Sequence, residues 1–161
     1  MRRLIVVCLA ALIASAATFA GTGSSQSAPL PLQFAVLGDN FGTIGNHSFC
    51  RGAINVRLSV PKGEKGVVRV TATSHGFTGD GPGWRRNPVC RMVLGTEFIS
   101  ARGYLVPKYS NAAFGPKPGT RVVQDVHTGS GPVAIETRTY APNSGFRQIY
   151  SRGVSYYVLV P

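Results

Sequence analysis

Apolar and polar residues alternate along Ala53–Val60 (AINVRLSV), and a period of two is typical of a strand with one buried face. The same alternation returns in Val67–His75 (VVRVTATSH), after the turn sequence Pro61–Gly66. No stretch of 11 or more residues keeps a helical period, and 20 Gly and 11 Pro punctuate the chain. The sequence therefore predicts an all-β protein that contains a hairpin over these segments.

Further strands are predicted along the rest of the chain, with turn signals between them: Phe98–Val106, Thr120–Thr128, Pro132–Tyr140 and Phe146–Val160. The middle two are predicted to form a hairpin around Thr128–Gly131. Short strands at this spacing favour a single antiparallel β-sandwich, which we assign to residues 32–161.

Cysteines add one expected crosslink. Cys8 lies in the N-terminal apolar run, which leaves Cys50 and Cys90 as a pair with a separation of 40 residues. Extending the strand parity puts both on inward faces, each followed by an outward arginine, Arg51 or Arg91. We therefore predict one disulfide that ties two layers together, which also fits an immunoglobulin-like architecture.

The N-terminus has the three-part layout of a secretory signal peptide over residues 1–20. Two arginines come first, an uninterrupted apolar run follows, and small residues lead to a predicted cleavage near Ala17 or Ala20. Residues 21–31 are then a flexible lead-in. These features predict secretion, to the extracellular space or the cell envelope. The alternative is an N-terminal membrane anchor, although an apolar segment of 17 residues is short against the roughly 20 that span a bilayer.

Positive charge dominates the chain, whose formal net charge is +11 at pH 7. Two of the 17 basic residues lie in the leader, and the other 15 exceed the 6 acidic residues by nine. Such a surface attracts anions over a Debye length of about 8 Å. The expected partners are an anionic polymer, an anionic lipid surface or an acidic protein. The alternative is that the charge serves solubility alone.

The segment Gly79–Arg91 (GDGPGWRRNPVCR) is the first candidate binding site. Its glycines do not match a phosphate-binding loop, and one Asp is too few for a calcium site. Trp84 can stack on a ring, and Arg85 and Arg86 can hold a carboxylate or phosphate, with Arg51 and Arg91 adjacent at the cysteines. The alternative is that Trp84 folds back onto the core and the arginine pair is only solvated.

Three residues are the weak catalytic candidates. Asp125 and His127 share an outward parity on the first strand of the predicted Thr128–Gly131 hairpin, and Glu136 has it on the second. An acid and a base on one face could perform acid–base chemistry. The alternative is a solvated sheet face with cross-strand charge pairs. No residue pattern indicates a cofactor, and the wide spacing of His47 from other ligand types indicates no metal site.

These observations favour an exported, basic, non-catalytic β-sandwich module with a binding role and a monomeric state. A small secreted hydrolase acting on an anionic polymer is the alternative, and a toxin or inhibitor that presents the loop to a target protein is a third. The apolar Val154–Val160 is predicted to be a core strand, and the alternative is an exposed edge that pairs with another chain.

Overall fold

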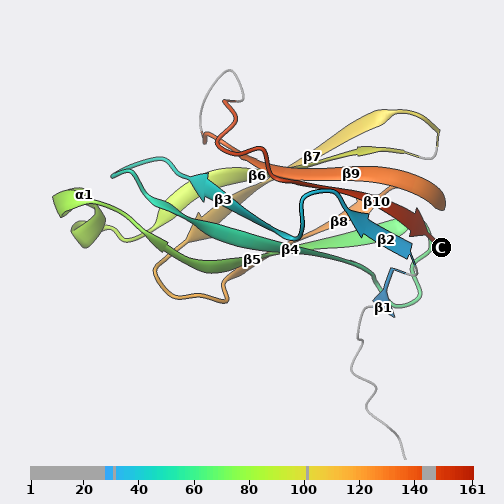
Figure 1. Cartoon of the computed structure of the whole chain (residues 1–161), viewed down its shortest axis with the longest axis horizontal. Helices are drawn as coiled ribbons and strands as arrows, with labels where there is room; N and C mark the ends of the chain where they lie inside the picture. The colour runs from blue at the N-terminus through green and yellow to red at the C-terminus, as the bar shows by residue number, and fades with distance from the viewer. Residues whose placement is uncertain (1–27, 31, 101, 143–147) are drawn as a thin grey trace, which may run out of the picture.

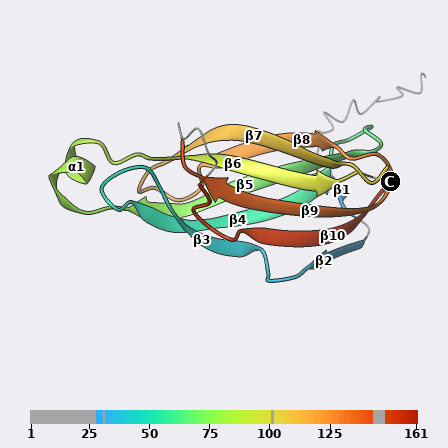
Figure 2. The same ribbon diagram turned by 90° about the horizontal axis from the view of Figure 1, so that it is seen from above.

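Two five-stranded antiparallel sheets lie face to face as two layers in the computed structural model (Figures 1 and 2). The structure describes these residues: 28–30, 32–100, 102–142 and 148–161. The predicted all-β class is confirmed, and the two layers form a sandwich-like arrangement. The immunoglobulin-like architecture stays a prediction. The signal peptide predicted over residues 1–20 lies outside the described residues.

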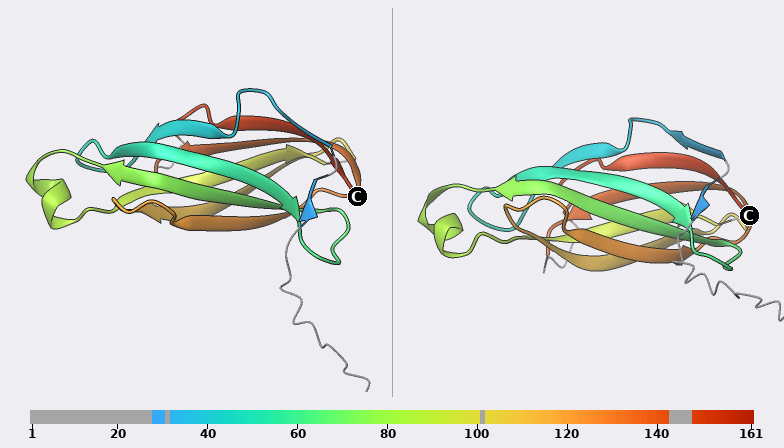
Figure 3. Two further views of the ribbon diagram at one scale, coloured as in Figure 1. Left: turned by 60° about the horizontal axis from the view of Figure 1, so that its bottom comes forward. Right: turned by 90° about the horizontal axis from the view of Figure 1, so that it is seen from below.

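We call the first layer sheet A. Its strand order is β1-β4-β5-β8. β3 pairs with the same edge of β4 as β1 does, but at the opposite end of β4. Its strands are β1 (Ala28–Pro29), β3 (Asn40–Ile44), β4 (Arg51–Val60), β5 (Val67–Thr78) and β8 (Arg121–His127). The predicted hairpin is the pair β4 and β5, because Val56 lies opposite Ala72 and Leu58 opposite Val70. Figure 3 shows β4, β5 and β8 side by side in this layer.

The second layer, sheet B, has the order β2-β10-β9-β6-β7. Its strands are β2 (Leu32–Ala35), β6 (Cys90–Ile99), β7 (Leu105–Phe114), β9 (Gly131–Tyr140) and β10 (Val154–Val160). The C-terminal strand β10 lies between β2 and β9, with Val154, Tyr156, Val158 and Val160 buried. It is therefore an internal strand of the sheet and not an exposed edge.

The core lies between the two sheets, where the inward-facing side chains, every second residue of each strand, pack against one another. A buried polar cluster interrupts this apolar layer and joins β8 to sheet B. The Gln124 side chain accepts a hydrogen bond from Thr96 at 2.6 Å and donates to Ser110 Oγ at 2.8 Å and to the Leu94 carbonyl at 3.2 Å. Because a buried amide costs free energy when it is left unpaired, these bonds fix how the two layers sit on each other.

The predicted disulfide between Cys50 and Cys90 is confirmed, with a Cα–Cα distance of 5.7 Å. It joins the residue before β4 to the first residue of β6, and so it links sheet A to sheet B. Both cysteines are fully buried. A structural disulfide indicates an oxidising, extracellular-type environment.

The hairpin predicted around Thr128–Gly131 is wrong. β8 pairs with β5 in sheet A, whereas β9 pairs with β6 and β10 in sheet B. The connecting residues do not close a strand pair, because the N–H groups of Thr128 and Gly129 both donate to the carbonyl of Gly66. The chain is thereby held against the β4–β5 turn and passes from one layer to the other.

The single strand predicted over Phe98–Val106 is also wrong. β6 ends at Ile99, and the chain turns back through hydrogen bonds between Ser100 and Tyr104 before β7 begins. Gly103 adopts φ +79° in this turn, a left-handed conformation that favours glycine. The result is a long β6–β7 hairpin, in which Cys90 lies opposite Phe114 and Ile99 opposite Leu105.

Four short elements were not predicted. Three are the strands β1, β2 and β3, and in β1 Ala28 and Pro29, inside the predicted 21–31 lead-in, pair with the end of β4. The fourth is the six-residue helix α1 (Gly81–Arg86), at one end of the molecule. No helix of the described part of the chain is long and apolar enough to cross a membrane.

Candidate functional site

A groove of about 690 Å³ lies on the outer face of sheet A. The register of four neighbouring strands aligns polar residues in a row along the bottom of this groove. Asn40 of β3 lies opposite Asn55 of β4, Asn55 lies opposite Thr73 of β5, and Thr73 lies opposite Arg121 of β8. These side chains share a face because outward residues recur with a period of two along each strand.

Hydrogen bonds hold one end of this row in place. The Asn40 Oδ1 atom accepts from Asn55 Nδ2 at 3.2 Å and lies 2.8 Å from His75 Nε2. The Asn55 amide also donates to the backbone carbonyl of Asp39 at 3.3 Å. The amide and imidazole groups are therefore oriented before any ligand arrives, which lowers the entropic cost of binding.

Two arginines supply the positive charge of the groove. Arg57 and Arg121 both line it, and both are exposed. In the part of the chain that the structure describes, the ion pairs are those of Arg51, Arg69 and Arg138, so Arg57 and Arg121 keep their guanidinium donors for a ligand. Guanidinium groups bind carboxylate, sulfate and phosphate through paired N–H donors.

Arg69, two residues from the groove, is by contrast fully engaged. It donates two hydrogen bonds of 2.7 Å to the carboxylate of Asp125, directly opposite on β8. This contact holds the pKa of Asp125 below its usual range and raises the pKa of Arg69. The pair therefore bounds the groove as a neutral unit, and the net charge of the groove comes from its own arginines.

The Gly79–Arg91 segment has a different character from that expected of a binding loop. The Trp84 side chain is only 9% exposed and belongs to the core cluster, which is the packed alternative. Gly79 lies against the indole, since a Cβ there would come within 2.7 Å of Cδ2. The ring centroids of His47 and Trp84 are 6.1 Å apart, and His47 Nε2 lies 2.9 Å from the Val89 carbonyl oxygen. His47 therefore contacts both α1 and the residues just before β6.

The four predicted arginines lie at this same end of the molecule, beside the disulfide. Arg85 and Arg86 are exposed in the last turn of α1, and Arg91 is exposed next to Cys90. Arg51 donates to Asp80 at 2.9 Å and lies over the Phe49 ring at 5.1 Å, so part of its charge is already compensated. This end offers cations but no aromatic stacking face from Trp84.

The weak catalytic candidates are only partly brought together. Asp125 and His127 share the outer face of β8 in sheet A, but both carboxylate oxygens of Asp125 accept hydrogen bonds from Arg69. Glu136 lies on the outer face of sheet B, on the opposite side of the molecule from His127, and pairs with Arg138. Among the described residues no group of three or more metal-ligating side chains could hold a metal ion.

Fold and site together define a small all-β protein with an inter-sheet disulfide and a polar, arginine-bearing sheet face. Comparisons with protein-family models, curated proteins and solved structures find no match for this chain.

Sequence reasoning missed the groove although part of its signal was present. The alternation along β4 and β5 marks Asn55, Arg57 and Thr73 as outward residues. Arg121 has the same parity as Asp125 and His127 in the predicted strand Thr120–Thr128, whereas Asn40 carries no such mark because no strand was predicted there. The row emerges when register places these segments side by side.

Proposed function

We propose that this chain is an exported, non-catalytic binding module that engages an anionic polymer through the groove of sheet A. The observation that carries the proposal is the polar row across four strands, which ends at Arg121 and lies beside Arg57. Neither arginine has an ion-pair partner among the described residues. A polar groove that spans several strands and carries two arginines suits a polymer that bears carboxylate, sulfate or phosphate groups.

Net charge and the disulfide support the same proposal. Outside the predicted leader, the 15 basic residues exceed the 6 acidic ones by nine, and this excess attracts a polyanion from a distance and raises the rate of encounter. The inter-sheet disulfide suits a protein that works outside the reducing cytosol, at the cell envelope or beyond it. For the hydrolase alternative, Glu136 lies on the other sheet from His127, and the Asp125 carboxylate that shares a face with His127 is held by Arg69.

The test compares two charge-matched double variants with the parent protein. Arg57→Gln/Arg121→Gln removes the groove cations, and Arg85→Gln/Arg86→Gln removes two cations from α1. Affinity for dextran sulfate is measured at about 50 and 200 mM salt, because phosphate- and sulfate-like contacts weaken with added salt. Uncharged dextran is the ligand control.

We expect the groove variant to lose at least tenfold in affinity at low salt, and to show a shallower salt dependence. The α1 variant should lose no more than about threefold, because it removes the same net charge without touching the groove. Equal losses in the two variants would show that only overall charge matters. A larger loss in the α1 variant would move the site to the disulfide end.

A further inference from the structure

The outer face of sheet B carries a second surface of opposite character. Strand register aligns one outward residue from each of the five strands in a single row. In order across the sheet these are Leu105, Ile99, Ala134, Tyr157 and Phe34. The four large side chains are 66%, 49%, 62% and 64% exposed, respectively. An apolar row of this extent on an outer face marks an interaction surface.

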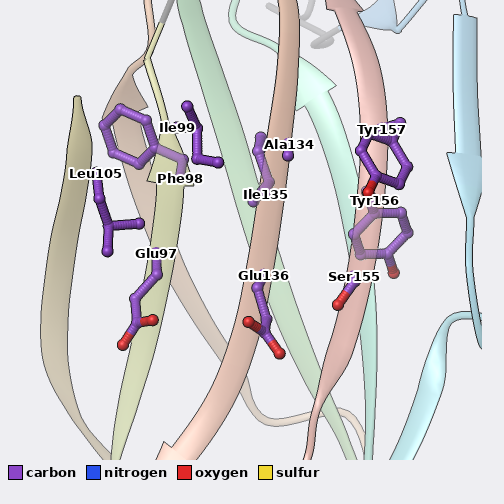
Figure 4. Close-up of a pocket in the computed structure, with 10 residues that line it drawn as sticks. All are labelled: Glu97, Phe98, Ile99, Leu105, Ala134, Ile135, Glu136, Ser155, Tyr156 and Tyr157. Carbon is purple, nitrogen blue, oxygen red and sulfur yellow. The ribbon is translucent and has the colours of Figure 1, made fainter. Parts of the chain in front are cut away.

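A hollow of about 190 Å³ lies at the centre of this row, where the small Ala134 sits between larger neighbours (Figure 4). Ile99 and Tyr157 are the residues directly opposite Ala134 on either side. The next outward row forms one end of the hollow and is polar. In Figure 4 the carboxylates of Glu97 and Glu136 lie next to each other at this end.

Contacts within the protein hold both carboxylates through one oxygen. Glu97 Oε1 accepts from the hydroxyl groups of Tyr140 at 2.6 Å and Tyr109 at 3.3 Å, and burial together with the shorter bond raises the pKa of Tyr140. Glu136 Oε1 pairs with Arg138, whose own pKa is raised by the contact. Arg138 and the exposed Arg152 line the adjoining hollow with Glu136, so two guanidinium groups lie near the two carboxylates. Each carboxylate still has one oxygen, Oε2, for which the described residues provide no hydrogen bond or ion pair.

Two of the 6 acidic residues of a chain with 17 basic ones therefore lie side by side at this end of the hollow. Like charges directly opposite on neighbouring strands destabilise a sheet, so the pair of Glu97 and Glu136 is held at some cost. An apolar slot with carboxylates at its end complements a side chain with an aliphatic stem and a cationic head. Lysine and arginine are such side chains, since they bury the stem and keep the charged head hydrogen-bonded.

We propose that the outer face of sheet B binds a protein partner that inserts a lysine or arginine side chain into this hollow, with flanking apolar residues on the Leu105–Phe34 row. The polyanion of the groove does not fit here, because the carboxylates repel it. A second copy of this chain is disfavoured, since two strongly basic molecules repel each other. A short basic segment of another protein supplies the cation without the high net charge of a second copy.

The experiment titrates the ¹⁵N-labelled protein with three capped tripeptides: acetyl-Leu-Lys-Leu-amide, its Leu-norleucine-Leu counterpart, and Leu-Glu-Leu. Norleucine keeps the aliphatic stem and removes the charge. Backbone amide shifts are followed over three short segments: 97–99, 134–136 and 155–157. The same titration is run on Glu97→Gln/Glu136→Gln, and on Asp80→Asn as a carboxylate control at the other end of the molecule.

We expect the lysine peptide to shift these amides and to bind at least tenfold more tightly than the norleucine peptide. The glutamate peptide should cause no shift. The double glutamine variant should lose the difference, whereas Asp80→Asn should keep it. Equal binding of the lysine and norleucine peptides would overturn the proposal, and so would shifts that map elsewhere. Concentration-dependent self-association that the double variant abolishes would assign the face to a second copy and overturn it as well.

Discussion

Gly45 is the residue on which the disulfide end depends most directly. A Cβ at this position would lie inside contact distance of Cys90 Sγ and 2.8 Å from Cys50 Sγ. Even alanine therefore forces the two cysteines apart or displaces the backbone of the loop before β4. The nearby Gly42, in β3, would place a Cβ no closer than 4.0 Å to any neighbour, so it provides a matched control.

We expect Gly45→Ala to expose free thiols or to lower the free energy of unfolding by about 2–4 kcal/mol, the range in which losing a native disulfide or overpacking a core falls. Thiol titration under denaturing conditions and a urea melt measure the two effects. Gly42→Ala should leave both unchanged. An intact disulfide with unaltered stability in Gly45→Ala would contradict the close packing of Gly45 against the two sulfur atoms.

At the scale of elements, α1 closes one end of the molecule through Trp84. The indole is 9% exposed, so Trp84→Ala should cost about 3 kcal/mol of stability, as removal of a large buried aromatic side chain does. Binding of dextran sulfate by the remaining folded protein should stay within about twofold of the parent value, because Trp84 does not line the groove.

Denaturant unfolding and the polyanion titration measure these two quantities, and Trp84→Phe is the milder control. The opposite pattern, a large loss of affinity with unchanged stability, would identify Trp84 as a ligand-stacking residue. This outcome distinguishes a packed tryptophan from the binding-loop hypothesis that the sequence suggested.

The elements also show what a sequence can predict. β4 and β5 were predictable because each strand has one buried and one solvent-facing side, and apolar and polar residues therefore alternate along its sequence. β7 was not, since an edge strand with Pro107 and a run of exposed leading positions carries little apolar periodicity. α1 was missed because six residues that include two glycines and a proline show no helical period.

Sheet membership was harder still. The turn after β8 has the glycines of a hairpin, yet the chain crosses to the other layer, because hydrogen bonds to Gly66 hold it against a distant turn. Local turn chemistry does not encode that contact. The same limit explains the candidate site, since Asp125 and Glu136 were placed on one face by an expected pairing that the fold does not form.

For the whole molecule, the two sheets turn surfaces of opposite character outward. The groove with Arg57 and Arg121 lies on the outer face of sheet A, and the hollow with Glu97 and Glu136 lies on the outer face of sheet B. The packed core separates them, so neither ligand meets the other. The proposed module would then join a polyanion on one side to a basic protein segment on the other.

This arrangement predicts that the two ligands bind at the same time. The affinity for acetyl-Leu-Lys-Leu-amide should change by less than about twofold when the groove is saturated with dextran sulfate, since a rigid core transmits little between its faces and the sites share no residue. The measurement is an amide-shift titration with and without the polymer, at about 150 mM salt so that free peptide and polymer attract each other less. Arg57→Gln/Arg121→Gln provides the control, because any remaining effect of dextran sulfate in that variant reflects peptide lost to the polymer. Competition seen only when the groove cations are present would mean that one surface serves both ligands.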